Sequence, residues 1–107
     1  MRRVERGSGA PRVAVVGGIH GDEPAGEQIV EHLIDTLTVD RGTVQLVIAN
    51  ERALAADERY TDTDLNRAFP GDIESDQYET ALAARLVEVL EGADAVLAIH
   101  TSKSAPP

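Results

Sequence analysis

The sequence predicts an α/β fold with a parallel-rich sheet and flanking helices. Three short apolar runs, Val13–Val16, Val44–Ala49 and Ala95–Ile99, have the length and the lack of alternation typical of buried strands. Segments with apolar residues at helical spacing separate these runs. Strands that are apolar throughout and are joined by helices indicate a parallel sheet covered on its faces. The expected order is strand, helix, strand, loop, helix, strand.

The first strand and the first helix have clear local boundaries. Pro11 and Gly17 flank the run Val13–Val16. The first helix is expected after Pro24, because proline is well tolerated in the first turn of a helix. Its apolar face is formed by Ala25, Ile29, Val30, Leu33, Ile34 and Leu37.

The later elements follow from the same patterns. The second strand ends at Asn50, and a polar stretch from residue 51 to residue 71 follows, with one helical turn near Ala53–Ala56. A second helix closes at Gly92 before the third strand. Its apolar face is formed by Tyr78, Leu82, Leu86, Val89 and Leu90. Residues 1–10 are expected to be a loose lead-in, and no element is expected in residues 102–107.

Composition limits the classes of function. A chain of 107 residues forms one domain at most, here residues 1–107. There is no cysteine, so a metal would need His, Asp, Glu or water as ligands. The net charge of -9 argues against a nucleic-acid partner, because phosphate binding requires a basic face. No apolar run approaches the ~18 residues of a membrane span. We therefore expect a cytoplasmic protein with neither nucleic acid nor membrane as a partner.

The charged residues are unevenly distributed among types. Nine of the ten basic residues are arginine, Lys103 is the only lysine, and nineteen residues are acidic. An acidic surface with few lysines favours a halophilic protein, in which salt screens self-repulsion. The alternative is an ordinary acidic protein in which arginine replaces lysine because its genome is rich in G and C.

Two strand ends carry potential metal ligands. His20 and Glu23 lie in a glycine-rich turn after the first strand, and His100 follows the third strand directly. Ligands bind parallel α/β sheets outside the carboxyl ends of the strands. Two histidines and a carboxylate are the ligands of catalytic zinc sites that keep one position open. The pattern predicts a Zn²⁺ site, in which Asp22 could orient a ligand.

Other readings of the same residues are less specific. His20 could be a surface histidine, and Glu23 a carboxylate favoured at a helix start. The glycines also suggest a dinucleotide-binding turn, but Val16 stands where that fingerprint needs glycine. His32 lies inside the first helix and is expected to be solvated rather than a ligand.

The segment Asp64–Gly71 carries a potential anion site. Arg67 presents a planar fork that matches a carboxylate, and Asn66 adds a directed donor. Arg59, eight residues earlier, is a second cation. These residues could hold the carboxylate of an amino-acid substrate. Alternatively, Arg67 pairs with one of its acidic neighbours, which are Asp62, Asp64 and Asp72.

The chain resembles the succinylglutamate desuccinylase/aspartoacylase family from about residue 12 to residue 102. The resemblance is carried by Gly-Gly-Ile-His-Gly-Asp-Glu, Asn50 with Ala53, Arg59, Asp-Leu-Asn-Arg-Ala-Phe-Pro-Gly and His100-Thr101. It implies a zinc-carboxypeptidase-like (phosphorylase/hydrolase-like) fold, here its N-terminal portion only. It also implies a zinc-dependent hydrolase that cleaves the amide bond of a small N-acyl amino acid. By this resemblance His20, Glu23 and His100 would hold zinc, Arg59 would contact the acyl group or the polarised carbonyl, and Asn66 and Arg67 would bind the substrate carboxylate.

The sequence departs from the family at two points. Ala98 stands where the family often has an acidic residue, two places before the last histidine. The family's general-base glutamate comes well after that histidine, and no glutamate follows His100 here. We therefore expect an N-terminal fragment of a longer enzyme, inactive by itself. The alternatives are a zinc carboxypeptidase acting on peptides and a non-catalytic metal-binding domain.

Overall fold

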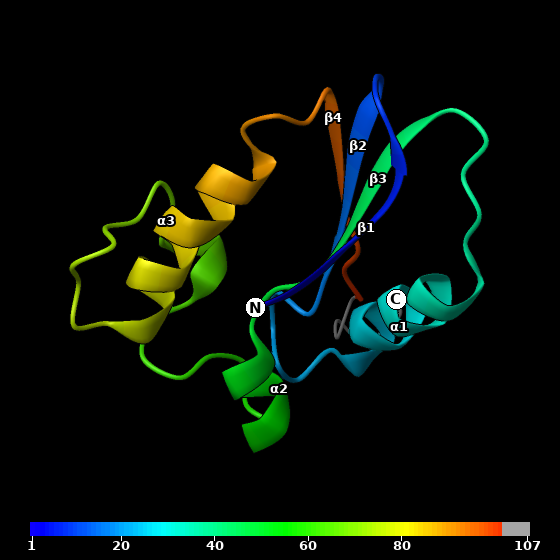
Figure 1. Ribbon diagram of the computed structural model, residues 1–107. Helices are drawn as coiled ribbons and strands as arrows, with labels where there is room; N and C mark the ends of the chain where they lie inside the picture. Colours follow the sequence, from blue (N-terminus) through cyan, green and yellow to red (C-terminus); the bar gives the residue numbers. More distant parts are fainter. Residues whose placement is uncertain (102–107) are drawn as a thin grey trace, which may run out of the picture.

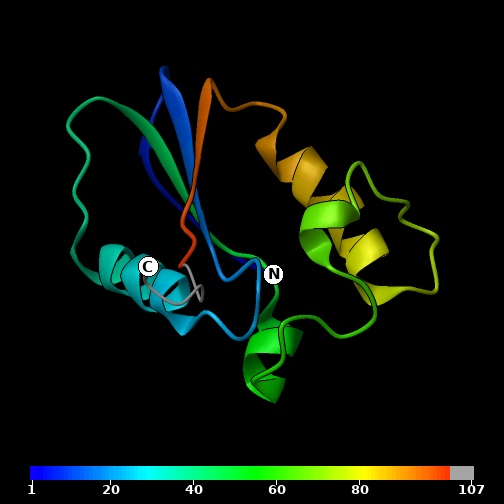
Figure 2. The ribbon, with the colours of Figure 1, turned by 180° about the vertical axis from the view of Figure 1, so that it is seen from behind.

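In a computed structural model, which describes residues 1–101, the chain folds into a four-stranded sheet with helices on both faces (Figure 1). Helices α1 and α3 lie on opposite sides of this sheet, as the view from behind also shows (Figure 2). Residues 102–107, for which no element is predicted, lie outside the described range. The elements in chain order are β1 (Arg2–Ser8), β2 (Arg12–Gly17), α1 (Pro24–Thr36), β3 (Gly42–Ile48), α2 (Glu51–Ala56), the 3₁₀ helix η1 (Leu65–Arg67), α3 (Tyr78–Leu90) and β4 (Ala95–Ala98).

The strand order is β1-β3-β2-β4, and β3, β2 and β4 run parallel. Val15 of β2 lies opposite Leu46 of β3 on one side and opposite Leu97 of β4 on the other. The predicted parallel-rich sheet with flanking helices is thus confirmed. Because β2 and β4 are adjacent and parallel, their carboxyl ends lie next to each other at one edge of the sheet.

The expectation of a loose lead-in at residues 1–10 is wrong. Strand β1 pairs antiparallel with β3 along its whole length, from Arg2 opposite Ile48 to Ser8 opposite Gly42. Val4 is the only large apolar residue of this strand, so no apolar pattern announces it. An edge strand can be held by main-chain hydrogen bonds while charged side chains keep its outer face in water.

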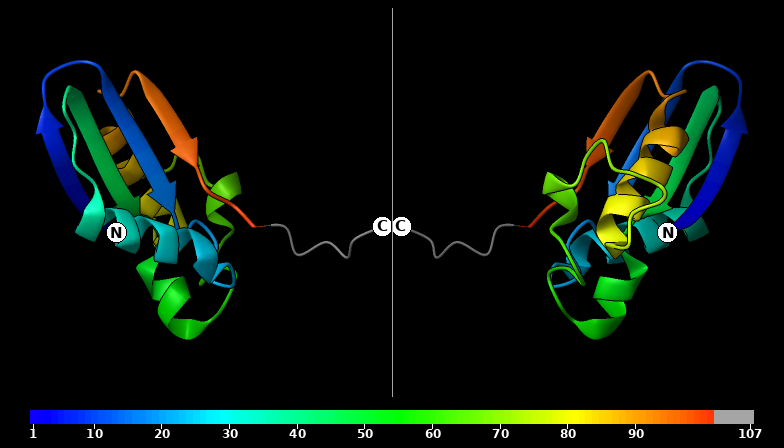
Figure 3. Two further views of the ribbon diagram at one scale, coloured as in Figure 1. Left: turned by 90° about the vertical axis from the view of Figure 1, so that its right-hand side faces the viewer. Right: turned by 90° about the vertical axis from the view of Figure 1, so that its left-hand side faces the viewer.

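The sheet separates two apolar clusters. Toward α3, the cluster includes Val16, Val47, Leu65, Leu82 and Leu86, each at most 1% exposed. Toward α1, a second cluster is built from Val30, Leu46 and Ile48. Figure 3 views the sheet from its two faces, with α1 in front of the strands in the left view and α3 in front of them in the right view. The apolar strands β2 and β3 are therefore buried on both faces, as expected for a covered parallel sheet.

Asn50 turns the chain from β3 into α2. Its side-chain oxygen accepts a hydrogen bond from the amide of Ala53 at 3.2 Å, which is an ordinary helix cap. The helix ends at Ala56, and the next residue, Asp57, caps it with a φ of 54° in the left-handed region. The helical turn predicted near Ala53–Ala56 is confirmed, and it directs the chain into the loop that leads to η1.

Strand β4 is the second edge of the sheet and is open to solvent. All four of its residues are exposed, with Val96 and Leu97 at 48% and 58%, so the expectation that this apolar run forms a buried strand is wrong. Within residues 1–101 no helix combines the length and the apolar character that crossing a bilayer requires.

Candidate metal centre

The turn between β2 and α1 brings His20 and Glu23 to the carboxyl edge of the sheet. Gly18 adopts a φ of +70°, which suits glycine. Gly21 has a different role, because a side chain there would overlap the backbone of Ala53 and Glu58. Gly18 bends the turn, whereas Gly21 allows it to pack against the C-terminal half of α2 and the residues just after it.

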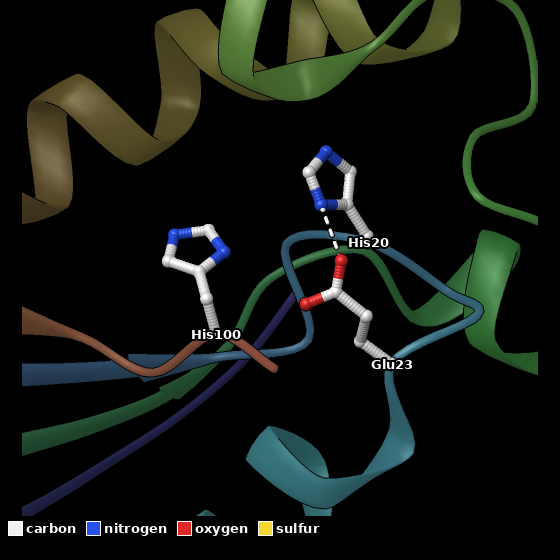
Figure 4. Close-up of side chains that lie close together, drawn as sticks. All are labelled: His20, Glu23 and His100. Atoms are coloured by element: carbon white, nitrogen blue, oxygen red, sulfur yellow. Dashed lines mark hydrogen bonds and ion pairs between the residues drawn. The ribbon is translucent and has the colours of Figure 1, made fainter. Parts of the chain in front are cut away.

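His20, Glu23 and His100 come together at this edge (Figure 4). One potential ligand atom from each residue lies within 4.8 Å of the others, and the two imidazole rings are 5.9 Å apart. His20 and Glu23 are 3% and 6% exposed, whereas His100 is exposed. The three donors therefore face a common point that is open to solvent on one side. Their chemistry, two imidazoles and a carboxylate, fits a zinc ion.

Glu23 is held from two directions. Its Oε2 lies 3.0 Å from Nδ1 of His20. Its Oε1 accepts hydrogen bonds from the backbone amide and the hydroxyl of Thr101, at 2.8 and 3.3 Å. Burial by itself raises the pKa of Glu23, but the hydrogen bonds from Thr101 and the contact with His20 together lower it below its ordinary value. Glu23 is therefore an ionised carboxylate of fixed orientation at neutral pH.

Asp64 orients His20. Its Oδ1 lies 2.8 Å from Nε2 of His20, a contact that the sequence did not predict. Burial opposes ionisation of Asp64, but hydrogen bonds from His20 and Asn66 outweigh it and lower the pKa. An ionised carboxylate only accepts, so Nε2 of His20 is the donor. Because Asp64 holds Nε2, a metal would bind His20 through Nδ1 and would replace the 3.0 Å contact between Nδ1 and Oε2 of Glu23.

Arg59 lies beside the three potential ligands. Its Nη1 is 3.3 Å from Oε2 of Glu23 and 3.8 Å from Oδ1 of Asp22, and its Nε is 3.8 Å from Oδ2 of Asp64. The side chain is 46% exposed, so it contacts the site while part of it remains in solvent. A guanidinium carries five N–H donors, which leaves capacity for a further acceptor.

Asn66 and Arg67 belong to η1, which starts directly after Asp64. Both are exposed. Within residues 1–101, no carboxylate forms an ion pair with Arg67, so the alternative in which Arg67 pairs with an acidic neighbour is not observed. His32 is exposed on α1, as expected.

Two contributors to this region are absent from the sequence-based list of site residues. Thr101 contacts Glu23 from 78 positions away, and it appears in the sequence only as the neighbour of His100. Glu79 is completely buried beneath the loop that carries Asp64. The sequence does indicate that Glu79 is buried, because Glu79 shares a helix face with Leu82, Ala83 and Leu86.

Fold and site define a class of protein: an α/β domain with a candidate two-histidine, one-carboxylate metal centre at the carboxyl edge of its sheet. A model of the "Succinylglutamate desuccinylase/Aspartoacylase catalytic domain" matches residues 9–105. The chain belongs to this family.

Individual relatives agree with this assignment. Succinylglutamate desuccinylase from Erwinia tasmaniensis is 40% identical over 90 residues, which is 78% of this chain and 26% of the relative. The human N-acyl-aromatic-L-amino acid amidohydrolase is 32% identical, over 85% of this chain and 33% of the relative. The chain thus spans about a quarter to a third of the length of these relatives.

Solved structures give the same result. A succinylglutamate desuccinylase/aspartoacylase from Rhodobacter sphaeroides superposes with a TM-score of 0.83 at 32% identity, over 94% of this chain and 33% of that one. Murine aminoacylase 3 superposes with a TM-score of 0.72 at 32% identity, over 87% of this chain and 36% of that one. The chain therefore has the fold of part of these hydrolases.

Proposed function

We propose that this chain forms the metal-binding part of a zinc-dependent hydrolase that cleaves the amide bond of a small N-acyl amino acid. The observation that carries the proposal is the convergence of His20, Glu23 and His100 within 4.8 Å at the edge of the sheet. Membership of a family whose relatives include an N-acyl-aromatic-L-amino acid amidohydrolase supports the choice of bond.

The donors that would hold the ion are Nδ1 of His20, a carboxylate oxygen of Glu23 and a ring nitrogen of His100. When bound, zinc acts as a Lewis acid that polarises a carbonyl and activates water. Asp64 keeps the His20 ring in one orientation, and Thr101 does the same for the Glu23 carboxylate. Both contacts are made by groups of the chain itself, and they fix the orientation of the two donors.

The cationic residues supply substrate recognition in this proposal. Arg67, exposed in η1 and without an ion pair in the described range, binds the substrate carboxylate together with Asn66. Arg59 contacts the acyl group or the scissile carbonyl, since its side chain contacts the site while part of it remains in solvent. The three side chains place positive charge and directed donors where an anionic amino-acid derivative approaches.

Metal analysis of the purified chain tests the proposed ligand set. We expect about one zinc ion per chain after zinc loading and desalting. His20→Ala and His100→Ala should lose it, whereas His32→Ala, a histidine exposed on α1, should bind as the unaltered chain does. Circular dichroism of each variant checks that the fold is kept. Equal zinc retention in all four proteins would overturn the assignment.

A further inference from the structure

Glu79 is a buried carboxylate that the proposed chemistry does not use. It lies in the first turn of α3 and is 0% exposed, on the helix face that also carries Leu82 and Leu86. Placing a charged group in an apolar layer is costly unless hydrogen bonds compensate for the lost water. Its partners therefore indicate why a carboxylate occupies a core position.

Four donors surround the two oxygens of Glu79. Oε2 accepts from the amide nitrogen of Thr61 at 2.7 Å and from Nδ2 of Asn50 at 2.8 Å. Oε1 accepts from the backbone amides of Asp62 and Thr63 at 2.8 and 3.0 Å. Three consecutive amides thus converge on one carboxylate, which holds the loop 61–63 against α3. Asn50 connects the same carboxylate to the end of β3.

The loop held by Glu79 leads directly into the site. Asp64, the next residue, contacts Nε2 of His20 at 2.8 Å, and η1 with Arg67 follows. A shift of this loop would displace Asp64 from His20. Among residues 1–101, the hydrogen-bond partners of Glu79 are Asn50 and the amides of the loop 61–63, none of which is a potential metal ligand, so Glu79 acts on the ligands through the loop.

We propose that Glu79 is a positioning residue that holds the loop 61–63 so that Asp64 orients His20 for metal binding. The link to metal binding rests on the proposed function. A carboxylate is required because all four partners are donors. In Glu79→Gln, a side chain of nearly the same shape, one oxygen becomes an NH₂ group that faces two N–H donors and leaves them without an acceptor.

A purely structural role would give a different result. If Glu79 only stabilised the fold, its loss would weaken zinc binding equally whether or not Asp64 is intact. If Glu79 acts through Asp64, the two substitutions must be non-additive. A double-mutant cycle on zinc affinity therefore separates the two roles, with Glu88→Gln, exposed on the same helix, as the matched control.

The experiment measures zinc affinity by competition with a chelator for the whole chain and its variants. We expect Glu79→Gln to weaken binding about tenfold, the lower end for a lost outer partner. In the Asp64→Asn background the same change should cost less than about twofold. Glu88→Gln should change nothing. Equal losses in both backgrounds would overturn the proposal.

Amide hydrogen exchange in the metal-free chain gives a readout that does not depend on zinc. The amides of residues 61–63 should be the slowest to exchange in the loop between α2 and α3, and Glu79→Gln should accelerate them selectively. The His20 ring N–H signal, sharp when Asp64 accepts from it, should broaden in the same variant. Rapid exchange of residues 61–63 in the unaltered chain would refute the proposal.

The two readouts also separate failure of this inference from failure of the proposed function. If the unaltered chain binds no zinc, the proposed function fails, and hydrogen exchange with the His20 signal decides on Glu79. If Glu79→Gln does not fold, Glu79→Asp keeps the charge but shortens the reach. That variant should fold with faster exchange at residues 61–63, and unchanged exchange there would contradict the proposal.

Discussion

Asp64→Asn is the most direct test of how the site is organised. The substitution keeps the shape of the side chain and removes its charge. The contact between Oδ1 of Asp64 and Nε2 of His20 is 2.8 Å long, within the ~2.7–2.9 Å range of charge-assisted hydrogen bonds. The Asp64 side chain is only 18% exposed, so water screens this contact weakly. We therefore expect zinc affinity to fall without loss of the fold.

The size of this effect follows from what asparagine retains. Loss of an outer partner of a ligating histidine typically lowers metal affinity ~10–100-fold. Asparagine can still offer one oxygen to Nε2 of His20, so a neutral hydrogen bond replaces a charge-assisted one. The expected loss is therefore in the lower part of that range, about ten- to thirtyfold, or about 1.4–2 kcal/mol.

Competition titration with a chelator of known affinity at pH 7 measures this loss. Asp40→Asn is the control, because it removes the same charge from an exposed residue outside the site. Thermal melts show whether either variant is destabilised. The orienting role would be refuted if the zinc dissociation constant of Asp64→Asn were within about threefold of that of the unaltered chain. An equal loss of zinc affinity in Asp40→Asn would also refute it.

Four further predictions concern stability, pH, substrate binding and activity. Leu86→Ala should lower the free energy of unfolding by about 2–5 kcal/mol, because Leu86 is 1% exposed. Leu97 is 58% exposed, so Leu97→Ala should lower it by about 0.5 kcal/mol or less. Denaturant titration measures both losses, and equal losses would contradict this prediction. Burial raises the pKa of Glu79, but its four hydrogen bonds outweigh burial and lower the pKa below the ordinary 4.5, so its stabilisation is present above pH 4.5 and is lost as the pH falls through the folded-state value. The acid side of the stability profile should therefore be shallower in Glu79→Gln, and identical slopes would count against this assignment. Arg67→Lys should weaken the binding of an N-acyl amino acid to the zinc-loaded chain about tenfold in an NMR titration, because an ammonium cannot reproduce the bidentate fork. Binding of the analogue whose carboxylate is replaced by an amide should not change. Equal weakening of both ligands would exclude a carboxylate anchor. The 107-residue chain should hydrolyse N-acyl amino acids slowly or not at all. A general base contributes ~10²–10⁴-fold to such a reaction, and the carboxylates of Glu23 and Asp64 cannot serve as one because both are engaged with His20. Robust, chelator-sensitive hydrolysis would disprove this prediction.

Local patterns in the sequence were enough for the parallel strands and the three potential ligands. Each apolar run of four to six residues marks a strand of the parallel sheet, although β4 is exposed rather than buried, and the residues after the run mark the carboxyl edge of the sheet. The sequence alone therefore places His20 and His100 at one edge of the sheet. Glu23 follows from its spacing of three residues from His20, because a short turn limits where its side chain can point.

The contacts that orient these ligands were decided by the tertiary structure. Asp64 lies 44 positions from His20, and Thr101 lies 78 positions from Glu23. Such pairs depend on the order of the strands and on the path of the loop after α2, which no local pattern specifies. Glu79 is a case in between, since its place on an apolar helix face marks it as buried while its four donors come from two other segments.

Strand β1 shows the same division for the fold. This strand has no regular alternation of polar and apolar residues and contains almost no apolar side chains, so the burial of its side chains did not determine its position. The main-chain groups at the open edge of β3 did, because unpaired N–H and C=O groups at a sheet edge accept any strand of suitable register. Apolar runs thus determined the three parallel strands β2, β3 and β4 and the positions of the ligands that follow them, whereas hydrogen bonding between distant segments determined the place of β1 and the orientation of the site.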